Sequence, residues 1–381
     1  MKPSLALFAL SLSLLAGLAI APAGADCGAG AVRLVTGYDS AADSVCRRGD
    51  AGAAHFSLVI APEAEPINPS PWYAFTLDGA PGRYQVELIY AAAAHRYAPW
   101  IRSGDGHWIR LGEDRVVLAD EGRRAVLDVT LGAAPLQVAA QPPYTLADYA
   151  SLERRWPGPW RTIGHSVEGR DLRALILEPL ADVDGWVLVL GRQHPPEVPG
   201  AWALDAFVDE ALRLREAGLL RSGLIVIPVL NPDGVEAGYW RLNENRVDLN
   251  RDWRARTQPE VLAVFALLDA LSLAQSDLAL MVDFHATVAE RLYLPQPEEL
   301  PAEANARLDA WLAAMEADGV FETLEPMRTN PRRRVSAKAV FTDDWRTVAV
   351  TWEAGDETAP DLVRDHARRA AHHWALSRNG P

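Results

Sequence analysis

Several features that would assign this chain to a common class are rare or absent. Only two cysteines, Cys27 and Cys46, occur among 381 residues. The motif H-E-x-x-H is missing, which excludes a thermolysin-type zinc site. Ser166 lies in GHSVE, where Glu168 replaces the second glycine of G-x-S-x-G, and this argues against a serine hydrolase. After an N-terminal stretch, no apolar run reaches the ~20 residues needed to cross a membrane.

Basic residues are outnumbered by acidic ones. The formal net charge is -14, from 37 Lys and Arg against 51 Asp and Glu. A strongly acidic chain is repelled by phosphate backbones and anionic lipids, so neither nucleic acid nor an anionic membrane is expected as a partner. Solubility alone is a sufficient explanation of the charge.

The N-terminus is typical of a secretory signal. Lys2 precedes an apolar stretch from Leu5 to Ile20, and Ala23-Gly24-Ala25 provides small residues for cleavage. We expect residues 1–25 to be removed and the mature chain to be periplasmic or secreted, without a membrane anchor. An exported protein with two cysteines favours a Cys27–Cys46 disulfide, and two free buried thiols are the alternative.

Residues 26–140 carry the signals of an antiparallel β-sandwich. Short segments rich in β-branched and aromatic residues are separated by Gly, Pro, Asp or Asn. We expect strands at 31–37, 55–61, 71–77, 83–91 and 123–131. The aromatic residues of this region are interpreted as core packing rather than as a binding face.

Residues 141–381 change to an α/β pattern, after a boundary at Gln141-Pro142-Pro143. Strands that alternate with helices indicate a mixed or largely parallel sheet. We expect helices at 144–155, with Thr145 as N-cap, and at 201–217, 259–273, 302–317 and 360–375. The expected strands are 186–190, 224–230, 278–284 and 347–352.

Polar side chains follow the ends of these strands, where ligands gather in open α/β sheets. The turn H-P-P-E presents His194 and Glu197, N-P-D-G follows the next strand, and His285 and Glu353 end two more. A catalytic zinc site takes three protein ligands and leaves a position for water, which His194, Glu197 and His285 could supply. Alone, H-x-x-E is a weak signal, and a lone histidine is more often part of a core.

A charged segment, YWRLNENRVDLNRDW, spans 239–253. It contains Arg241, Asp248, Asn250 and Arg251. Two arginines with an asparagine suit the recognition of a carboxylate through paired hydrogen bonds. A solvated charged loop is the alternative interpretation.

The ordered set H-P-P-E, N-P-D-G, a lone Arg, D-L-N-R-D-W, a strand-end His and a late T-x-E resembles the zinc metallocarboxypeptidases. The resemblance covers about 155–375. Within this family, the chain is most similar to the cytosolic-carboxypeptidase-like branch and its exported bacterial relatives. These proteins place a β-sandwich before the catalytic domain. A weaker likeness extends to about residue 55. The resemblance implies a mixed-sheet α/β catalytic domain, one Zn²⁺ ion and peptide or protein C-termini as substrate.

The resemblance also implies roles for individual residues. His194, Glu197 and His285 match the zinc ligands, and Asp248 matches the acid that orients the first histidine. Arg241 matches the arginine that stabilises the oxyanion. The residues that match the carboxylate grip and the general base are Asn250, Arg251 and Glu353.

Three positions depart from the family pattern or leave it open. Ala286 follows His285 where relatives often have Ser or Gly. Tyr293 is the only tyrosine between His285 and Glu353 and lies close to His285 in sequence, so the role of the family's mobile tyrosine stays unassigned. Lys338, with the basic run 332–334, lies near the family's side-chain-selecting position. We hypothesise that it favours an acidic C-terminal residue, and a basic solvent-facing loop is the alternative.

The function predicted is therefore zinc-dependent removal of C-terminal residues from peptides or proteins. A second hypothesis is a carboxypeptidase that trims the peptide stems of peptidoglycan, which export would bring within reach. A third, from a different class, is a peptide-binding protein whose catalytic site has decayed. His372 and His373 are poorer candidates as ligands because adjacent residues do not share a helix face.

Overall fold

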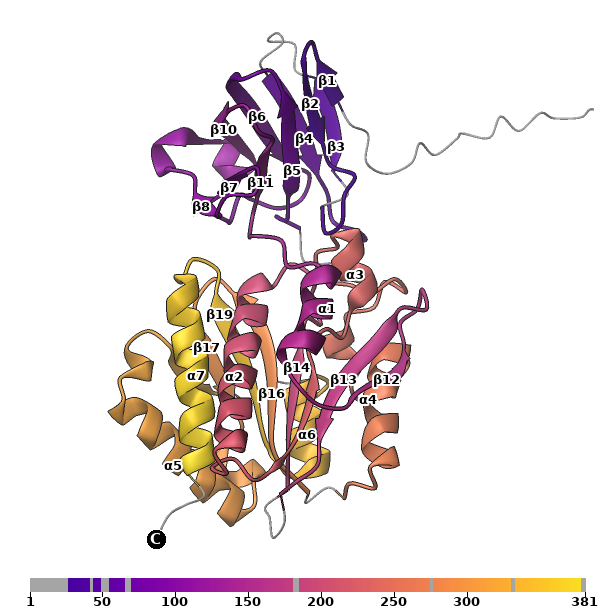
Figure 1. The fold of residues 1–381 in the computed structure, drawn as a ribbon, viewed down its shortest axis with the longest axis vertical. Helices are drawn as coiled ribbons and strands as arrows, with labels where there is room; N and C mark the ends of the chain where they lie inside the picture. The colour runs from indigo at the N-terminus through magenta and orange to yellow at the C-terminus, as the bar shows by residue number, and fades with distance from the viewer. Residues whose placement is uncertain are drawn as a thin grey trace, which may run out of the picture.

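The computed structural model of the chain describes residues 27–41, 44–48, 55–65, 70–180, 185–274, 277–329 and 333–377. The predicted signal segment 1–25 and Arg332 lie outside the described residues. A β-sandwich stands on one end of a larger α/β unit (Figure 1). Among the described residues, no helix combines the length and apolarity needed to cross a bilayer.

Two sheets form the sandwich. The first has the order β1-β2-β5-β11-β7-β8, made of Cys27–Ala29, Val32–Val35, Ala74–Gly79, Leu136–Ala139, Trp100–Ser103 and Ile109–Arg110. The second has the order β3-β4-β6-β10-β9, made of Val45–Arg48, His55–Ile60, Gly82–Tyr90, Arg124–Leu131 and Val116–Ala119. Pairing is antiparallel except between β4 and β6, which run parallel. Two single-turn 3-10 helices, Glu113–Arg115 and Asp120–Gly122, flank β9.

The sandwich core follows from the alternation of its strands. In β10 every second side chain is buried, and Leu127 and Val129 meet Phe75 and Leu77 of the other sheet in one apolar cluster. Cys27 and Cys46 form the predicted disulfide, which joins β1 of one sheet to β3 of the other. The sandwich aromatics pack as expected: Trp72, Tyr73 and Trp100 are buried and Trp108 is half-buried.

An eight-stranded mixed sheet organises the second unit, in the order β12-β13-β15-β14-β16-β19-β17-β18. Its strands are Trp160–His165, Asp171–Leu177, Gly223–Ile227, Trp186–Gly191, Leu278–Thr287, Val348–Gly355, Arg291–Leu294 and Glu325–Arg328. The central strands β15, β14, β16 and β19 are parallel to one another. They are rich in Val, Ile and Leu because both of their faces are covered.

Helices cover both faces of this sheet (Figure 1). α1 (Leu146–Arg155), α2 (Val198–Glu216), α5 (Ala302–Ala317) and α7 (Pro360–Leu376) contribute to one apolar cluster. α4 (Pro259–Ala270) and α6 (Ala337–Trp345) contribute to the cluster on the other face. Three further 3-10 turns, Leu249–Arg251 (η3), Pro297–Glu299 and Val320–Glu322, lie in connections.

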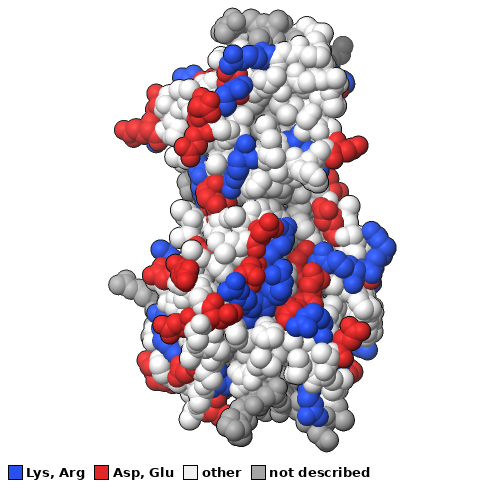
Figure 2. Space-filling model, turned by 60° about the vertical axis from the view of Figure 1, so that its left-hand side comes forward, with Lys and Arg blue, Asp and Glu red and all other residues white. Residues whose placement is uncertain are grey.

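The five helices and four strands expected in this unit all form, with ends shifted by a few residues. In the N-P-D-G stretch, Asn231 caps a short helix, α3 (Pro232–Ala237), by accepting from Gly234 N at 3.0 Å. The strands of His285 and Glu353 run two residues beyond each of them, to Thr287 and Gly355. Charges of both signs are interspersed on the face drawn in Figure 2, so the net charge is not gathered into one acidic surface there.

Candidate metal centre and active site

The H-P-P-E turn links the end of β14 to the start of α2. Arg192, at the start of the turn, has a positive φ of 48° and is buried. Its guanidinium donates to the Pro195 carbonyl at 2.9 Å and to the Tyr149 hydroxyl at 2.9 Å, which fixes the turn from within. Gly200, in the first turn of α2, lets this helix approach β16, because a Cβ there would lie 2.6 Å from the His285 carbonyl oxygen.

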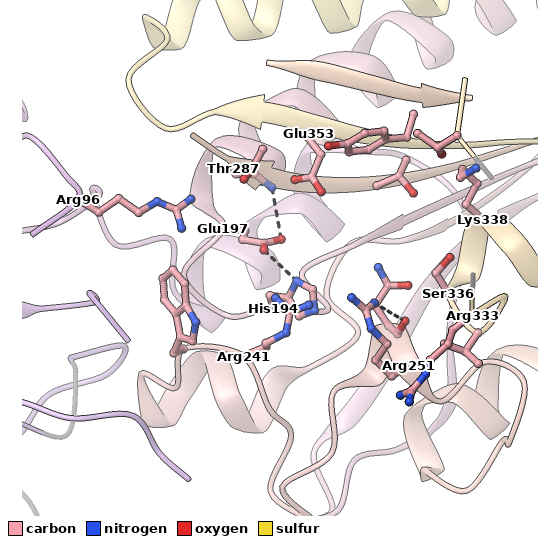
Figure 3. Close-up of a pocket in the computed structure, with 17 residues that line it drawn as sticks. Arg96, His194, Glu197, Arg241, Arg251, Thr287, Arg333, Ser336, Lys338 and Glu353 are labelled. Atoms are coloured by element: carbon pink, nitrogen blue, oxygen red, sulfur yellow. Dashed lines mark hydrogen bonds and ion pairs between the residues drawn. The ribbon is translucent and has the colours of Figure 1, made fainter. Parts of the chain in front are cut away.

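Three side chains converge at this point. His194 Nδ1 lies 2.8 Å from Glu197 Oε1, and His285 Nδ1 lies 2.7 Å from Glu197 Oε2. The ligand atoms of the three residues all lie within 4.8 Å of one another. The structure therefore brings together the three predicted metal ligands. Figure 3 shows two of them, His194 and Glu197, side by side in the cavity.

Each imidazole is held from behind by a carboxylate. His194 Nε2 lies 3.0 Å from Asp248 Oδ1, as predicted, and His285 Nε2 lies 2.9 Å from Asp283 Oδ2. Burial lowers the pKa of His285, but the charges of Asp283 and Glu197 outweigh it and raise the pKa well above its usual value. Carboxylates behind metal-binding histidines fix the ring and strengthen the ligand.

Asp283 is a site residue that the sequence reasoning missed. It is fully buried on β16, and Gln193 Nε2 donates to both of its oxygens at 2.8 Å. Gln193 in turn accepts from Trp253 Nε1 at 2.9 Å. The sequence does contain a signal for Asp283, the pattern D-x-H within a strand. Residues i and i+2 of a strand lie on the same face, so Asp283 and His285 are expected side by side.

Glu353 stands beside this cluster on the neighbouring strand. β16 and β19 run parallel with His285 in register with Glu353. Burial raises the pKa of Glu353 to about 7; the His285 charge opposes this and the Glu197 charge adds to it. Within the described part of the chain, its buried Oε2 atom has no hydrogen-bond partner. An orphaned carboxylate oxygen next to three convergent ligands is suited to a water or substrate group.

The centre lies in a cavity of about 490 Å³. Seventeen residues line it: Arg96, His194, Glu197, Trp240, Arg241, Asn250, Arg251, Ala286, Thr287, Tyr293, Thr329, Arg333, Val335, Ser336, Lys338, Thr351 and Glu353. The two acidic residues of this set lie at the centre, while Arg251, Arg333 and Lys338 lie on one side of it and Arg96 on the other (Figure 3). The cavity is therefore suited to a ligand that carries negative charge.

Arg241 and Asp248 are joined to each other. Arg241 Nε donates to Asp248 Oδ2 at 2.7 Å, while the other oxygen of Asp248 faces His194. Burial raises the pKa of Asp248, but the hydrogen bond to His194 and the charges of His194 and Arg241 outweigh it and hold the pKa well below its usual range. Asp248 is thus an ionised link between the arginine and the metal cluster.

Asn250 and Arg251 lie on η3, next to the cluster. Asn250 Nδ2 is 3.1 Å from His285 Nε2, and its Oδ1 accepts from Ala337 N at 3.0 Å. Arg251 Nη1 donates to the Asn250 carbonyl at 2.9 Å, and the side chain is exposed. Both residues reach the cavity, as a carboxylate grip requires, although the Asn250 amide also has partners in the protein.

Lys338 is buried, so it does not belong to the solvent-facing basic loop that was the alternative interpretation of this segment. It lies in the first turn of α6, where Ser336 caps the helix by accepting from Ala339 N at 3.3 Å. Its Nζ donates to the Leu294 carbonyl at 3.3 Å, and burial lowers its pKa to about 8. Arg334, from the basic run, pairs instead with Asp343 and Glu299.

Other candidates lie away from the cavity. Ser166 donates to Asp233 at 2.6 Å and has no histidine partner among the described contacts. His372 and His373 face Glu210 and Asp318 at 3.2 and 3.0 Å. Tyr293, whose role the sequence left unassigned, does line the cavity, in register with Thr351 on β19.

The donor set fits zinc. Two imidazole nitrogens and one carboxylate are a common ligand set of catalytic zinc sites. The two carboxylates behind the histidines complete the pattern of such sites, and the orphaned Glu353 oxygen marks a place for a further group beside them.

Comparison with known proteins agrees with this geometry. Residues 159–295 match the family model described as Zinc carboxypeptidase. A stretch of 104 residues is 36% identical to cytosolic carboxypeptidase 2 of Danio rerio, covering 26% of this chain and 14% of that protein. An uncharacterised protein of Zymomonas mobilis, ZMO1242, is 29% identical over 131 residues, 32% of this chain and 34% of that protein. The matches thus span well under half of either relative.

Solved structures share the whole architecture. A metallo-carboxypeptidase from Burkholderia cenocepacia has a TM-score of 0.74 at 21% identity and covers 91% of this chain and 98% of its own. A metallo-carboxypeptidase from Pseudomonas aeruginosa, in complex with (2-guanidinoethylmercapto)succinic acid, has a TM-score of 0.71 at 19% identity and equal coverage. At sequence identities of 21% and 19%, this structural likeness establishes the fold of the chain, including its β-sandwich.

Residues 159–295, which contain His194, Glu197 and His285, thus match the zinc carboxypeptidase family model. More particularly, cytosolic carboxypeptidases are among its sequence relatives, and bacterial metallo-carboxypeptidases share its two-unit fold. The resemblance inferred from the sequence motifs is thereby confirmed.

Proposed function

We propose that this protein is a zinc-dependent carboxypeptidase that hydrolyses the last peptide bond of peptides or proteins. One zinc ion would be held by His194, Glu197 and His285. The observation that supports this most is the convergence of these three ligands beside Glu353, whose Oε2 atom is buried, inside a cavity whose other charged side chains are all basic. When bound, zinc supplies a Lewis acid that polarises the scissile carbonyl and makes water a stronger acid.

Glu353 would act as the general base. Its Oε2 atom has no protein partner among the described residues and can accept a proton from the attacking water. The same oxygen can then pass the proton to the leaving amine. A carboxyl group with a pKa of about 7 exchanges protons readily near neutral pH.

The arginines would set the position of the cut. Arg241 would donate hydrogen bonds to the oxyanion as charge develops on the scissile carbonyl oxygen. Asn250 and Arg251 would bind the free C-terminal carboxylate, because a guanidinium and an amide provide directed N–H donors for it. A carboxylate-binding pair so close to the metal ligands favours the terminal peptide bond over internal ones.

Lys338 would favour an acidic C-terminal side chain. No carboxylate of the described residues lies within 4.0 Å of its Nζ, and the carbonyl of Leu294 is its hydrogen-bond partner. A buried ammonium without a paired charge is costly. A substrate carboxylate would relieve that cost, whereas a neutral side chain would not.

We also propose export for this protein, with domains at 26–140 and 141–381 after removal of 1–25. The Cys27–Cys46 disulfide supports this, since disulfides persist in oxidising compartments. The partners would be peptide or protein C-termini, with neither nucleic acid nor membrane involved.

A peptide screen tests the proposal. Zinc-loaded protein is incubated with peptides that end in Glu, Lys or Phe, with their C-terminally amidated forms, and with peptidoglycan stem peptides, and products are read by mass spectrometry. We expect loss of single residues from the free-acid Glu peptide and none from amidated forms. Preference for Phe would refute the role of Lys338, and action on stem peptides alone would favour the wall-trimming hypothesis.

The Glu353→Gln variant is the matched control, because it keeps the shape of the side chain. It should retain zinc and lose nearly all turnover. A wild-type protein that binds peptides but cleaves none, under conditions where zinc is present, would indicate a decayed binding protein and contradict the proposed activity.

A further inference from the structure

The loop that carries Arg241 is attached to the β-sandwich by one carboxylate. Glu63, in the segment after β4, accepts from three consecutive backbone amides. Trp240 N donates to Oε2 at 3.0 Å, and Arg241 N and Leu242 N donate to Oε1 at 2.7 and 2.8 Å. The Arg246 guanidinium also donates to the Glu63 carbonyl oxygen at 2.6 Å.

This contact joins segments that are far apart in sequence, separated by 177 to 179 residues. Residues 238–248, all within the described ranges, form neither helix nor strand, so the loop conformation depends on such contacts. Ionised acceptors make stronger hydrogen bonds than neutral ones. Successive N–H groups also form a concave site that favours an anion.

We propose that Glu63 is a positioning residue for Arg241, so that the β-sandwich takes part in catalysis. The inference rests on the proposed function, in which Arg241 stabilises the oxyanion. Arg241 lies beside His194 in the cavity (Figure 3), with its Nε held by Asp248 at 2.7 Å. Its guanidinium is therefore located by two carboxylates: Asp248 holds the side chain and Glu63 holds the backbone from which it extends.

Loss of Glu63 should move the loop without detaching it. Trp240 remains packed in the apolar core of the sandwich, and Asn231 Nδ2 still donates to the Leu242 carbonyl at 2.9 Å. The three amides would then turn toward water. A displacement of about 1 Å in a catalytic group can cost ~100-fold in rate.

Steady-state kinetics of Glu63→Ala and Glu63→Gln test the proposal, with Glu65→Gln as the matched control from an exposed position of the same segment. We expect kcat to fall by up to ~100-fold in Glu63→Ala, with KM and zinc content close to wild type. Glu63→Gln should lose less, because one amide oxygen can still accept. A drop in zinc content or a rise in KM with unchanged kcat would overturn the proposal.

A double-mutant comparison separates positioning from general structural support. In an Arg241→Ala background, Glu63→Ala should cause no further loss of kcat, whereas equal losses in both backgrounds would overturn the proposal. If Arg241→Ala itself leaves kcat unchanged, the oxyanion role in the proposed function fails. If Arg241→Ala lowers kcat and Glu63→Ala does not, only the role of Glu63 fails.

Hydrogen exchange provides a readout that does not depend on activity. The amides of Trp240, Arg241 and Leu242 should exchange faster in Glu63→Ala than in wild type, while those of β16 should not change. Unaltered exchange at the three amides would contradict the idea that Glu63 holds them.

Discussion

Replacing Asp283 by asparagine tests how firmly the second histidine must be held. Asp283 accepts from Gln193 Nε2 at 2.8 Å through both oxygens, and one of them lies 2.9 Å from His285 Nε2. Asparagine offers one oxygen and one NH₂ group. If its oxygen stays with His285, its NH₂ group faces the NH₂ group of Gln193, which cannot reverse without losing its bond from Trp253.

The expected cost comes from weaker metal binding. Loss of a carboxylate behind a metal-binding histidine typically reduces metal affinity 10- to 100-fold, which corresponds to about 1.4–2.7 kcal/mol. Asp283 is fully buried, so water cannot replace the lost charge. Competition with a chromophoric chelator would measure the zinc dissociation constant, and activity should recover partly as zinc is raised. Zinc affinity equal to that of Asp105→Asn, an exposed control, would refute the reasoning.

Three further predictions concern selectivity and stability. Because burial lowers the pKa of Lys338 to about 8, its charge is present below that pH and lost above it. The ratio of kcat/KM for peptides ending in Glu and Gln should therefore fall as pH rises through about 8, and a flat ratio would contradict the acidic selectivity. Replacing Cys27 and Cys46 by serine should lower the free energy of unfolding by about 2–4 kcal/mol, and an unchanged urea midpoint would argue against this. Gly200→Ala should lower the free energy of unfolding by about 1–3 kcal/mol, because its Cβ would lie 2.6 Å from the His285 carbonyl oxygen. If the variant keeps the wild-type Tm and zinc affinity, α2 can shift away from β16 without cost and the prediction is wrong.

Much of the metal cluster could be predicted because its parts carry local signals. His194 and Glu197 share one turn after a buried strand, and the parallel order of β14 and β16 brings His285 to the same edge of the sheet. That edge is where neighbouring parallel strands end together. Glu353 followed from the same rule, although the register that places it opposite His285 could be seen only in the structure.

Contacts made across the two units had no such signal. Glu63 stands in an irregular segment of the sandwich, 178 residues before Arg241, so its contact with the Arg241 loop depends on how the two units pack together. Asp283 did have a local pattern, two residues before His285, but an acid in an apolar strand became meaningful only when its partner Gln193 was visible.

The fold was predicted where apolar runs were long and was missed where they were short. β12 has no fully buried side chain, so its pairing with β13 was not expected from the sequence. The nine-residue α6 was also missed, yet it places Lys338 in the cavity. Burial of Lys338 is thus a tertiary effect that its basic neighbourhood in the sequence did not indicate.

The most direct test is a zinc titration of chelator-treated protein, followed by both metal analysis and cleavage of a peptide with a free C-terminal glutamate. We expect no turnover without metal and full turnover at one zinc per chain. We also expect stoichiometric zinc without turnover in Glu353→Gln, and neither bound zinc nor turnover in His285→Ala. Cleavage by the metal-free protein, or full activity in His285→Ala, would contradict the assignment of this site.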